Sequence, residues 1–218
     1  MSKFVAITLL SFFTLFASAQ DQDPKAKAIL DELSKVTKAY KTITTEIIFT
    51  ILNKEKKPAE KPQLWKVQVK GQKFRLEIPG SSILCDGKTV WNYNKDAREV
   101  TIKNFDPDSD EQNPAKLFTM YENGYKFKYD KEEKVGVAQC HVIDLFPAIK
   151  PEKKKFHTIK LYVDKTKKQV VKLKMIMKDG TTQEYTVKSM KPNLEIADTV
   201  FVFDTKGLKP DQISDERD

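Results

Sequence analysis

The sequence predicts a mainly β protein of the α+β class, built on one strongly curved antiparallel sheet. Three observations predict this fold. Short apolar segments alternate with period two along most of the chain. Two Asp-Gly pairs mark tight hairpin turns, and only two segments show helical spacing. The alternating segments number about ten or eleven, joined mostly by short loops. We therefore expect a single domain whose helices cover the concave side of the sheet.

The N-terminus has the pattern of a secretory signal. Lys3 is followed by an apolar run, Phe4–Phe16, and then by the small-x-small sequence Ala17-Ser18-Ala19. This order predicts a signal peptide over residues 1–19, cleaved after Ala19. The apolar run is shorter than the ~20 residues that a bilayer requires, so it does not favour a transmembrane anchor. We expect an exported protein with no stable membrane insertion.

After the predicted cleavage site, a first helix starts at Asp23-Pro24, which places an N-cap before a proline. The helix is expected to end near Lys41, and its apolar stripe consists of Ile29, Leu33, Val36 and Tyr40. The centre of the predicted sheet is Ser81–Asn94, where Asp86-Gly87 is expected to form a two-residue turn. The other predicted strands lie within 42–52, 64–70, 73–78, 98–102, 125–129, 137–146, 157–164, 170–178 and 181–190. The ordered part is expected to end at Phe203, and 206–218 is expected to be a polar tail.

A second, short helix is predicted over Pro114–Tyr121, after an acidic loop. It is very apolar for a helix of about two turns, so it must lie over other apolar surface. Its apolar residues are Leu117, Phe118, Met120 and Tyr121. A curved sheet under such a helix makes a hydrophobic cavity, although a filled core is the ordinary alternative. The candidates for the cavity wall lie on the more apolar face of each strand: Ile47, Phe49, Phe74, Leu76, Ile78, Trp91 and Tyr93.

Composition argues against several function classes. The formal net charge is +8, but there are only three arginines, so nucleic-acid recognition is not expected. The favoured interpretation of the lysines is that they cover solvated strand faces. The second interpretation is that they attract anionic lipid or an acidic partner. The sequence has no nucleophile elbow, phosphate-binding loop or zinc-type spacing. We expect neither an enzyme nor a cofactor or metal site.

The cysteines and the acidic loop leave alternatives open. Cys85 and Cys140 lie in predicted strands, which favours two buried thiols over one disulfide, although an oxidising compartment permits a bridge. His141 and His157 are interpreted as ordinary strand residues. The acidic loop 104–112 offers oxygens to a calcium ion but lacks the glycine and distal glutamate of an EF-hand, which favours a solvated loop.

Four stretches of the chain resemble the LolA family, in the family's order. The first helix leads into a Thr/Ile/Phe strand, and Leu64-Trp65 precedes Lys73-Phe74-Arg75-Leu76. The hairpin Ile83–Asn94 is the most specific match, and Asp198, Phe201 and Phe203 are similar to a closing D-x-x-F-x-F. The resemblance implies an incomplete antiparallel β-barrel over residues 20–218, with a helical lid over a hydrophobic cavity.

The family resemblance also implies a function. LolA-like proteins are periplasmic chaperones that take the acyl chains of lipoproteins released from the inner membrane and carry them to the outer membrane. The implied partners are acylated lipoproteins, the inner-membrane lipoprotein-releasing ABC transporter and an outer-membrane lipoprotein acceptor. We expect a periplasmic monomer. The alternative is a lipid-binding sensor, or an enzyme that borrowed the fold.

One position departs from the family pattern. The best-known members carry an Arg-Pro pair before the Phe strand, and that arginine latches the lid. The matching positions here are Lys70-Gly71. Lysine is a point donor and cannot form the two-pronged hydrogen bond of arginine. Lys70 is therefore the candidate for a weaker latch.

Overall fold

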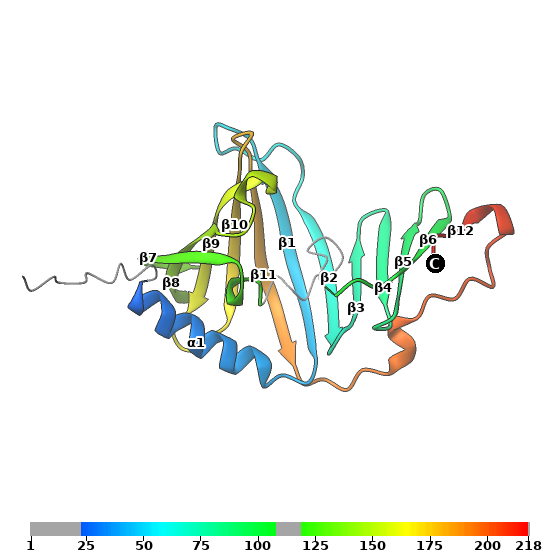
Figure 1. Cartoon of the computed structure of the whole chain (residues 1–218), viewed down its shortest axis with the longest axis horizontal. Helices are drawn as coiled ribbons and strands as arrows, with labels where there is room; N and C mark the ends of the chain where they lie inside the picture. Colours follow the sequence, from blue (N-terminus) through cyan, green and yellow to red (C-terminus); the bar gives the residue numbers. More distant parts are fainter. Residues whose placement is uncertain (1–22, 108–118, 218) are drawn as a thin grey trace, which may run out of the picture.

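The computed structural model describes residues 23–107 and 119–217. In this part of the chain, one curved sheet has the strand order β12-β6-β5-β4-β3-β2-β1-β11-β10-β9-β8-β7 (Figure 1). Neighbouring strands are antiparallel, except that β12 is parallel to β6. The fold is mostly β, with one α-helix among the described residues, and the sheet does not close. It therefore agrees with the predicted incomplete barrel.

The elements have the following bounds: α1 Pro24–Lys38, β1 Ile43–Leu52, β2 Gln63–Lys70, β3 Lys73–Ile78, β4 Ser81–Cys85, β5 Thr89–Asn94, β6 Glu99–Asn104, β7 Tyr125–Val135, β8 Ala138–Pro147, β9 Phe156–Asp164, β10 Val170–Met177, β11 Thr182–Pro192 and β12 Ile213–Asp215. Short 3-10 helices are η2 Met120–Glu122, η3 Pro151–Lys153, η4 Asp198–Phe201 and η5 Pro210–Gln212.

The helix α1 begins as predicted and covers one half of the sheet. The carboxylate of Asp23 accepts hydrogen bonds from the backbone N–H groups of Lys25 and Ala26, at 2.8 and 3.2 Å, which is the usual action of an N-cap. It also accepts the N–H of Tyr129 in β7 at 2.9 Å, which fixes the start of the helix to the sheet. The helix ends at Lys38 and packs on a core formed by β8, β9 and β10.

The central hairpin differs from the prediction in one detail. The N–H of Asp86 donates to the carbonyl of Thr89 at 3.3 Å, so the two loop residues are Gly87 and Lys88 rather than Asp86 and Gly87. Gly87 has a φ of +93° at the first loop position, which favours glycine. Asp86 instead accepts the N–H groups of Lys88 and Thr89, both at 2.8 Å. The turn lies where the sequence predicts it, but its two loop residues are shifted by one position towards the C-terminus.

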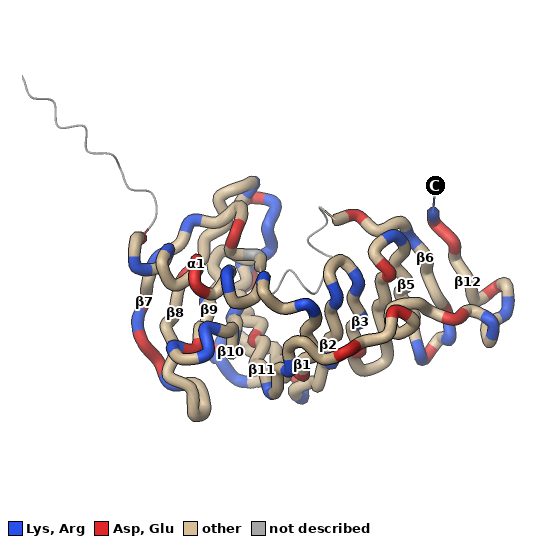
Figure 2. Tube along the Cα trace, turned by 90° about the horizontal axis from the view of Figure 1, so that it is seen from below, with Lys and Arg blue, Asp and Glu red and all other residues tan. Residues whose placement is uncertain are grey.

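The two faces of the sheet differ in chemistry. Because side chains alternate along a strand, the register places Ile47, Trp65 and Tyr185 on the concave face, and the charged residues of the same strands on the convex face. On the convex face Lys172 and Lys174 pair with Glu184, at 2.8 and 2.7 Å. Figure 2 shows that basic and acidic residues are spread along the whole described trace rather than gathered in one segment. Solvated, internally paired strand faces account for much of the charge.

The C-terminal segment corrects the prediction of a polar tail after residue 206. Residues 194–217, which we call the strap, run across the convex side of β2–β6 and end in β12, which pairs with β6 (Figure 1). Leu208 and Ile213 pack on a cluster made by β4, β5 and β6. Two apolar side chains in an otherwise polar stretch thus pack on apolar residues of the sheet, and the pairing of β12 with β6 adds backbone hydrogen bonds.

Candidate functional site

The concave face carries a continuous apolar surface that extends beyond α1. Under the helix, the core consists of residues from α1, β8, β9 and β10. Beyond it, a second cluster covers β1–β5, and its buried members are Ile43, Ile47, Val67, Val69, Phe74, Leu76, Cys85 and Val90. Tyr185 of β11 packs against both clusters and so joins them. The two clusters give the concave face an apolar lining, which is the chemistry that apolar ligands need.

Three aromatic rings lie together at the middle of this surface. Phe49 stacks on Trp65 with ring centroids 4.4 Å apart, and Tyr185 lies 5.0 Å from Phe49 and 5.7 Å from Trp65. The indole N–H of Trp65 donates to Gln63, and the hydroxyl of Tyr185 donates to Gln183, both at 3.0 Å. Because each polar atom has a partner on its own strand, the ring faces remain an apolar surface.

The tyrosine of this cluster lies in a buried environment. Burial raises the pKa of Tyr185 to about 12, so its phenol stays neutral at physiological pH. Trp65 is half-buried, whereas Phe49 is buried. Trp65 and Tyr185 were absent from the predicted wall. Alternation along β2 already groups Trp65 with Val67 and Val69, but the position of Tyr185 depends on the pairing of β11 with β1, which no local pattern shows.

The seven predicted wall residues do not form one wall. Five of them lie on the concave face: Ile47, Phe49, Phe74, Leu76 and Ile78. Trp91 and Tyr93 lie on the convex face, because Cys85 pairs with Val90 and Leu84 with Trp91. There Trp91 and Tyr93 pack with Leu84 and the strap, and the Tyr93 and Phe203 rings are 4.8 Å apart. The placement of these two residues on the cavity wall is therefore wrong, and the lipid contact of the other five stays a prediction.

Lys70 contacts the strap, and its role as a lid latch stays a prediction. Its ammonium group lies on the convex face and donates to Asp198 at 2.8 Å and to the carbonyl of Ile196 at 3.0 Å. Lys73 also pairs with Asp198 at 2.8 Å. These hydrogen bonds lower the pKa of Asp198 to about 2. Among the described residues, Lys70 thus fastens the strap to the convex face of the sheet.

The predicted lid lies largely outside the described residues. Leu117 and Phe118 are in the part that is not described, and of Met120 only the backbone is described, within η2. Tyr121 is 3% exposed and belongs to the cluster under α1. Glu122 accepts a hydrogen bond from Ser34 at 2.6 Å and pairs with Lys38 at 2.9 Å. The end of the predicted lid helix is therefore fixed to α1.

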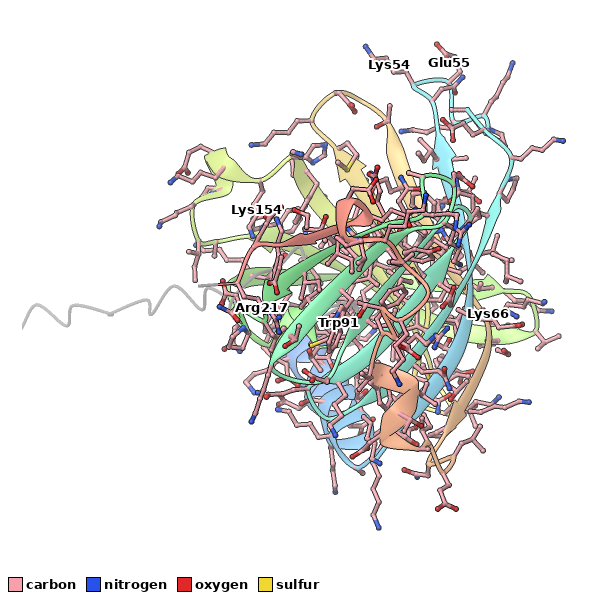
Figure 3. The ribbon with its side chains drawn as sticks, turned by 90° about the vertical axis from the view of Figure 1, so that its right-hand side faces the viewer. Lys54, Glu55, Lys66, Trp91, Lys154 and Arg217 are labelled. Carbon is pink, nitrogen blue, oxygen red and sulfur yellow. The ribbon has the colours of Figure 1, made fainter. Side chains whose placement is uncertain are left out.

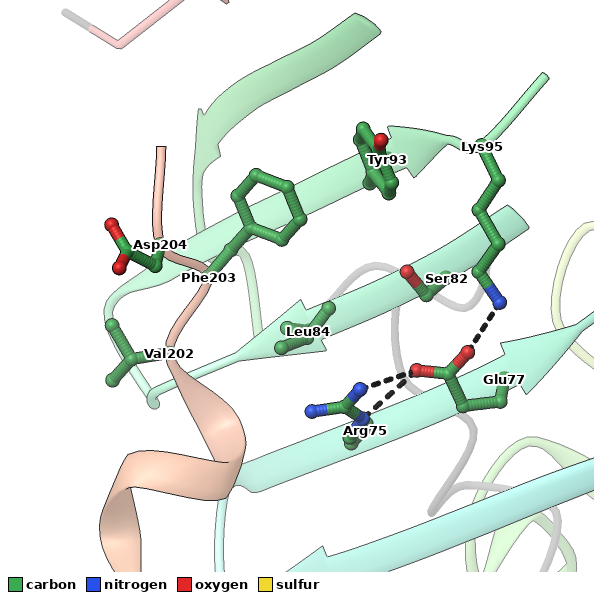
Figure 4. Close-up of a pocket in the computed structure, with 9 residues that line it drawn as sticks. All are labelled: Arg75, Glu77, Ser82, Leu84, Tyr93, Lys95, Val202, Phe203 and Asp204. Carbon is green, nitrogen blue, oxygen red and sulfur yellow. Dashed lines mark hydrogen bonds and ion pairs between the residues drawn. The ribbon is translucent and has the colours of Figure 1, made fainter. Parts of the chain in front are cut away.

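A pocket of about 390 Å³ lies on the convex face, where the strap crosses β3–β5 (Figure 4). Figure 4 shows Arg75, Glu77 and Lys95 on one side of it, with Tyr93 and Phe203 on the other. Glu77 pairs with both Arg75 and Lys95. The charged side chains that line the pocket thus pair with one another. We therefore take the apolar residues of the concave face as the stronger candidate site.

Other chemistry is sparse in the described part of the chain. Cys85 and Cys140 are both free and buried, as favoured from the sequence. Burial raises the pKa of each thiol to about 11, so neither is a ready nucleophile. Residues 23–107 and 119–217 contain no group of three His, Cys, Asp or Glu side chains placed to hold a metal ion. Within the same ranges, no helix has the length and apolarity to cross a bilayer.

Comparison with known proteins adds a family and a fold. Residues 64–204 match the family model described as "Outer membrane lipoprotein carrier protein LolA". An uncharacterized protein of Methanocaldococcus jannaschii, MJ0687, is 27% identical over 211 residues. That match covers 92% of this chain, and the chain spans 58% of the length of this relative.

Two solved structures are similar in fold. An uncharacterized conserved protein from Thermus thermophilus superposes with a TM-score of 0.57 at 15% identity, covering 89% of this chain and 99% of that one. LprF from Mycobacterium bovis superposes with a TM-score of 0.50 at 14% identity, covering 81% of this chain and 96% of that one. At these identities the likeness concerns the fold alone.

Proposed function

The chain belongs to the LolA family, and on this premise we propose that its concave face binds the acyl chains of lipoproteins. The observation that carries the proposal is the aromatic cluster of Phe49, Trp65 and Tyr185. It lies on an apolar surface that continues past the cover of α1. The described members of the two clusters are apolar and the polar atoms of the rings have partners, which suits a hydrocarbon chain that offers neither hydrogen bonds nor charge.

The energetics fit a carrier. Each buried CH₂ contributes ~0.8 kcal/mol, so a long acyl chain contributes on the order of ten kcal/mol. An exposed chain therefore cannot cross water unaided, and a carrier must both cover it and release it. A sheet that does not close offers apolar surface along an open side, which suits release better than a sealed core does.

The finer proposal concerns transport. We propose that the protein is exported to the periplasm, with its signal peptide cleaved after Ala19. There it takes acylated lipoproteins from an inner-membrane ABC transporter and delivers them to an outer-membrane acceptor. Membership of a family described as outer membrane lipoprotein carrier proteins supports this proposed transport route. The role is one of binding, and it requires no catalytic group.

Two adjacent residues of β2 provide the test. Trp65 lies on the concave face, whereas Leu64 lies on the convex face and is 37% exposed. Binding of a fluorescent triacylated lipopeptide is measured for Trp65→Gln and Leu64→Gln, after circular dichroism has shown that both fold. We expect Trp65→Gln to weaken binding at least tenfold, because a polar amide replaces apolar ring surface. The affinity of Leu64→Gln should stay within twofold of that of the unchanged protein. Equal affinities for the two variants would reject the concave face as the lipid site.

A further inference from the structure

Three loops meet at one end of the sheet, the end at which β1 finishes shortly after Phe49 (Figure 1 and Figure 3). They are residues 53–62, 148–155 and 178–181, and we call them together the basic rim. The backbone N–H of Lys178 donates to the carbonyl of Lys155 at 2.9 Å, and its ammonium group donates to the carbonyl of Pro151 at 2.8 Å. The ammonium group of Lys56 donates to Thr182, at the start of β11, at 3.1 Å. The loops thus form one connected surface.

The basic rim holds most of the excess positive charge of the chain. Its three segments contain nine lysines against four acidic residues, in a chain whose net charge is +8. Elsewhere lysines are commonly paired, as Lys160 is with Asp130 and Asp144 at 2.9 and 2.7 Å. In the rim, Lys57, Lys153 and Lys155 are exposed. No acidic residue of the described ranges forms an ion pair with these three side chains, so their charge faces solvent.

Two exposed apolar side chains lie in or next to the segment 148–155, which also holds Lys153 and Lys155. Ile149 is 63% exposed and Phe146, at the end of β8, is 38% exposed. Single exposed apolar residues are common on protein surfaces, so their exposure alone carries no information. The position of Ile149, in the same loop as lysines without an ion-pair partner among the described residues, is what suggests a function. Cationic side chains around a small apolar tip suit the surface of a bilayer with anionic headgroups.

We propose that the basic rim docks reversibly on a membrane surface that carries anionic lipids. The three segments contain lysine but no arginine, which suits diffuse attraction to many headgroups rather than two-pronged binding of one carboxylate on a protein. Ile149 then reaches the boundary of the headgroups. Docking in this orientation turns the end of the sheet beside the aromatic cluster towards the bilayer. The inference goes beyond acyl-chain binding and can be measured without it.

The test uses vesicles of phosphatidylcholine alone and vesicles with 30% phosphatidylglycerol, with the protein in its full mature form. We expect cosedimentation with the anionic vesicles only, weakened by added salt. The rim variant combines three substitutions, Lys57→Glu, Lys153→Glu and Lys155→Glu. We expect its affinity for the anionic vesicles to fall at least tenfold. Added to this triple variant, Ile149→Ser should lower the affinity about two- to fivefold more, because it removes an apolar contact with the bilayer.

A matched control separates the rim from net charge. Lys88, Lys134 and Lys167 are also exposed and lie in or beside turns at the opposite end of the strands. Changing these three to Glu removes the same total charge, and the affinity should then fall less than threefold. An equal loss in the two triple variants would overturn the proposal, because attraction would then follow net charge alone. Absence of binding to anionic vesicles by the unchanged protein would also overturn it and would leave an acidic protein as the partner of the rim. Neither result would bear on lipopeptide capture by Trp65 variants.

Discussion

The indole ring of Trp65 stacks on the phenyl ring of Phe49, with centroids 4.4 Å apart and ring planes at 26°. The two residues are diagonal neighbours across β1 and β2, since Ile47 pairs with Trp65 and Phe49 with Gln63. The second tryptophan of the chain, Trp91, lies on the convex face behind the sheet, 8% exposed. The two tryptophans therefore report on opposite faces of the same sheet.

This arrangement makes the proposed binding face visible by fluorescence. An acyl chain carrying bromine atoms quenches only an indole that it contacts closely. In Trp91→Phe, whose remaining tryptophan is Trp65, we expect such a chain to quench most of the emission. In Trp65→Phe, whose remaining tryptophan is Trp91, the same chain should leave the emission nearly unchanged. Equal quenching in the two variants would show that the chain binds elsewhere or without preference for a face.

The strap behind the sheet should contribute strongly to stability through Phe201. Its side chain is 0% exposed, whereas the neighbouring Val202 is 48% exposed. Replacing a buried phenylalanine by alanine typically costs ~3–5 kcal/mol, because apolar contacts are lost and a cavity remains. We expect that loss for Phe201→Ala in urea unfolding, against less than ~0.5 kcal/mol for Val202→Ala. A small effect of Phe201→Ala would mean that the strap unfolds before the sheet does.

Local patterns in the sequence predict most of the fold. Alternation identifies the strands, the Asp23 N-cap identifies the start of α1, and Asp-Gly pairs locate two hairpin turns. Alternation also shows that Trp91 and Tyr93 share a face. It cannot show which face, because a strand with apolar residues on one side fits either side of the sheet. The facing of these two residues depends on the strap that covers them.

The parts of the structure that the sequence does not predict depend on contacts between distant segments. Ile213 lies in a polar stretch and forms β12 only because it can pair with Val100 of β6. The partner of Lys70 is likewise distant, since Asp198 reaches it from the strap. Tyr185 joins the two halves of the concave surface through the pairing of β11 with β1. A family pattern correctly indicates the fold here, whereas the partner of Lys70 in the strap could not be predicted from it.

The two cysteines should be inert in the folded protein. Both are 0% exposed, and burial raises the pKa of each to about 11. Because the thiolate is the reactive form, we expect neither thiol to react with Ellman's reagent at pH 8, and both to react in denaturant. Cys85 lies in β4 and Cys140 in β8, far apart in the strand order. A mass lower by two hydrogen atoms in the purified protein would reveal a disulfide and contradict this expectation.

Attachment of the strap should depend on acid pH through Asp198. Hydrogen bonds from Lys70 and Lys73 lower the pKa of Asp198 from 3.8 to about 2. A lowered pKa means that the ionised form is favoured in the folded protein. The stabilisation is then fully present above pH 3.8 and is lost as the pH falls from about 4 towards 2. The pair is largely exposed, so the effect on global unfolding should be small.

Hydrogen exchange is the appropriate measurement, because it reports on the strap itself. We expect Asp198→Asn to speed amide exchange over residues 196–202 at pH 6, since both lysines lose their carboxylate partner. The exchange rate of the variant divided by that of the unchanged protein should fall towards one as the pH falls to about 2, where Asp198 itself becomes protonated. The control is Asp211→Asn, at an exposed residue of η5 that forms no ion pair with any described residue. That variant should leave exchange over 196–202 unchanged at both pH values. If Asp198→Asn behaved like this control, Phe201 and the backbone contacts of the strap would hold it without the lysines.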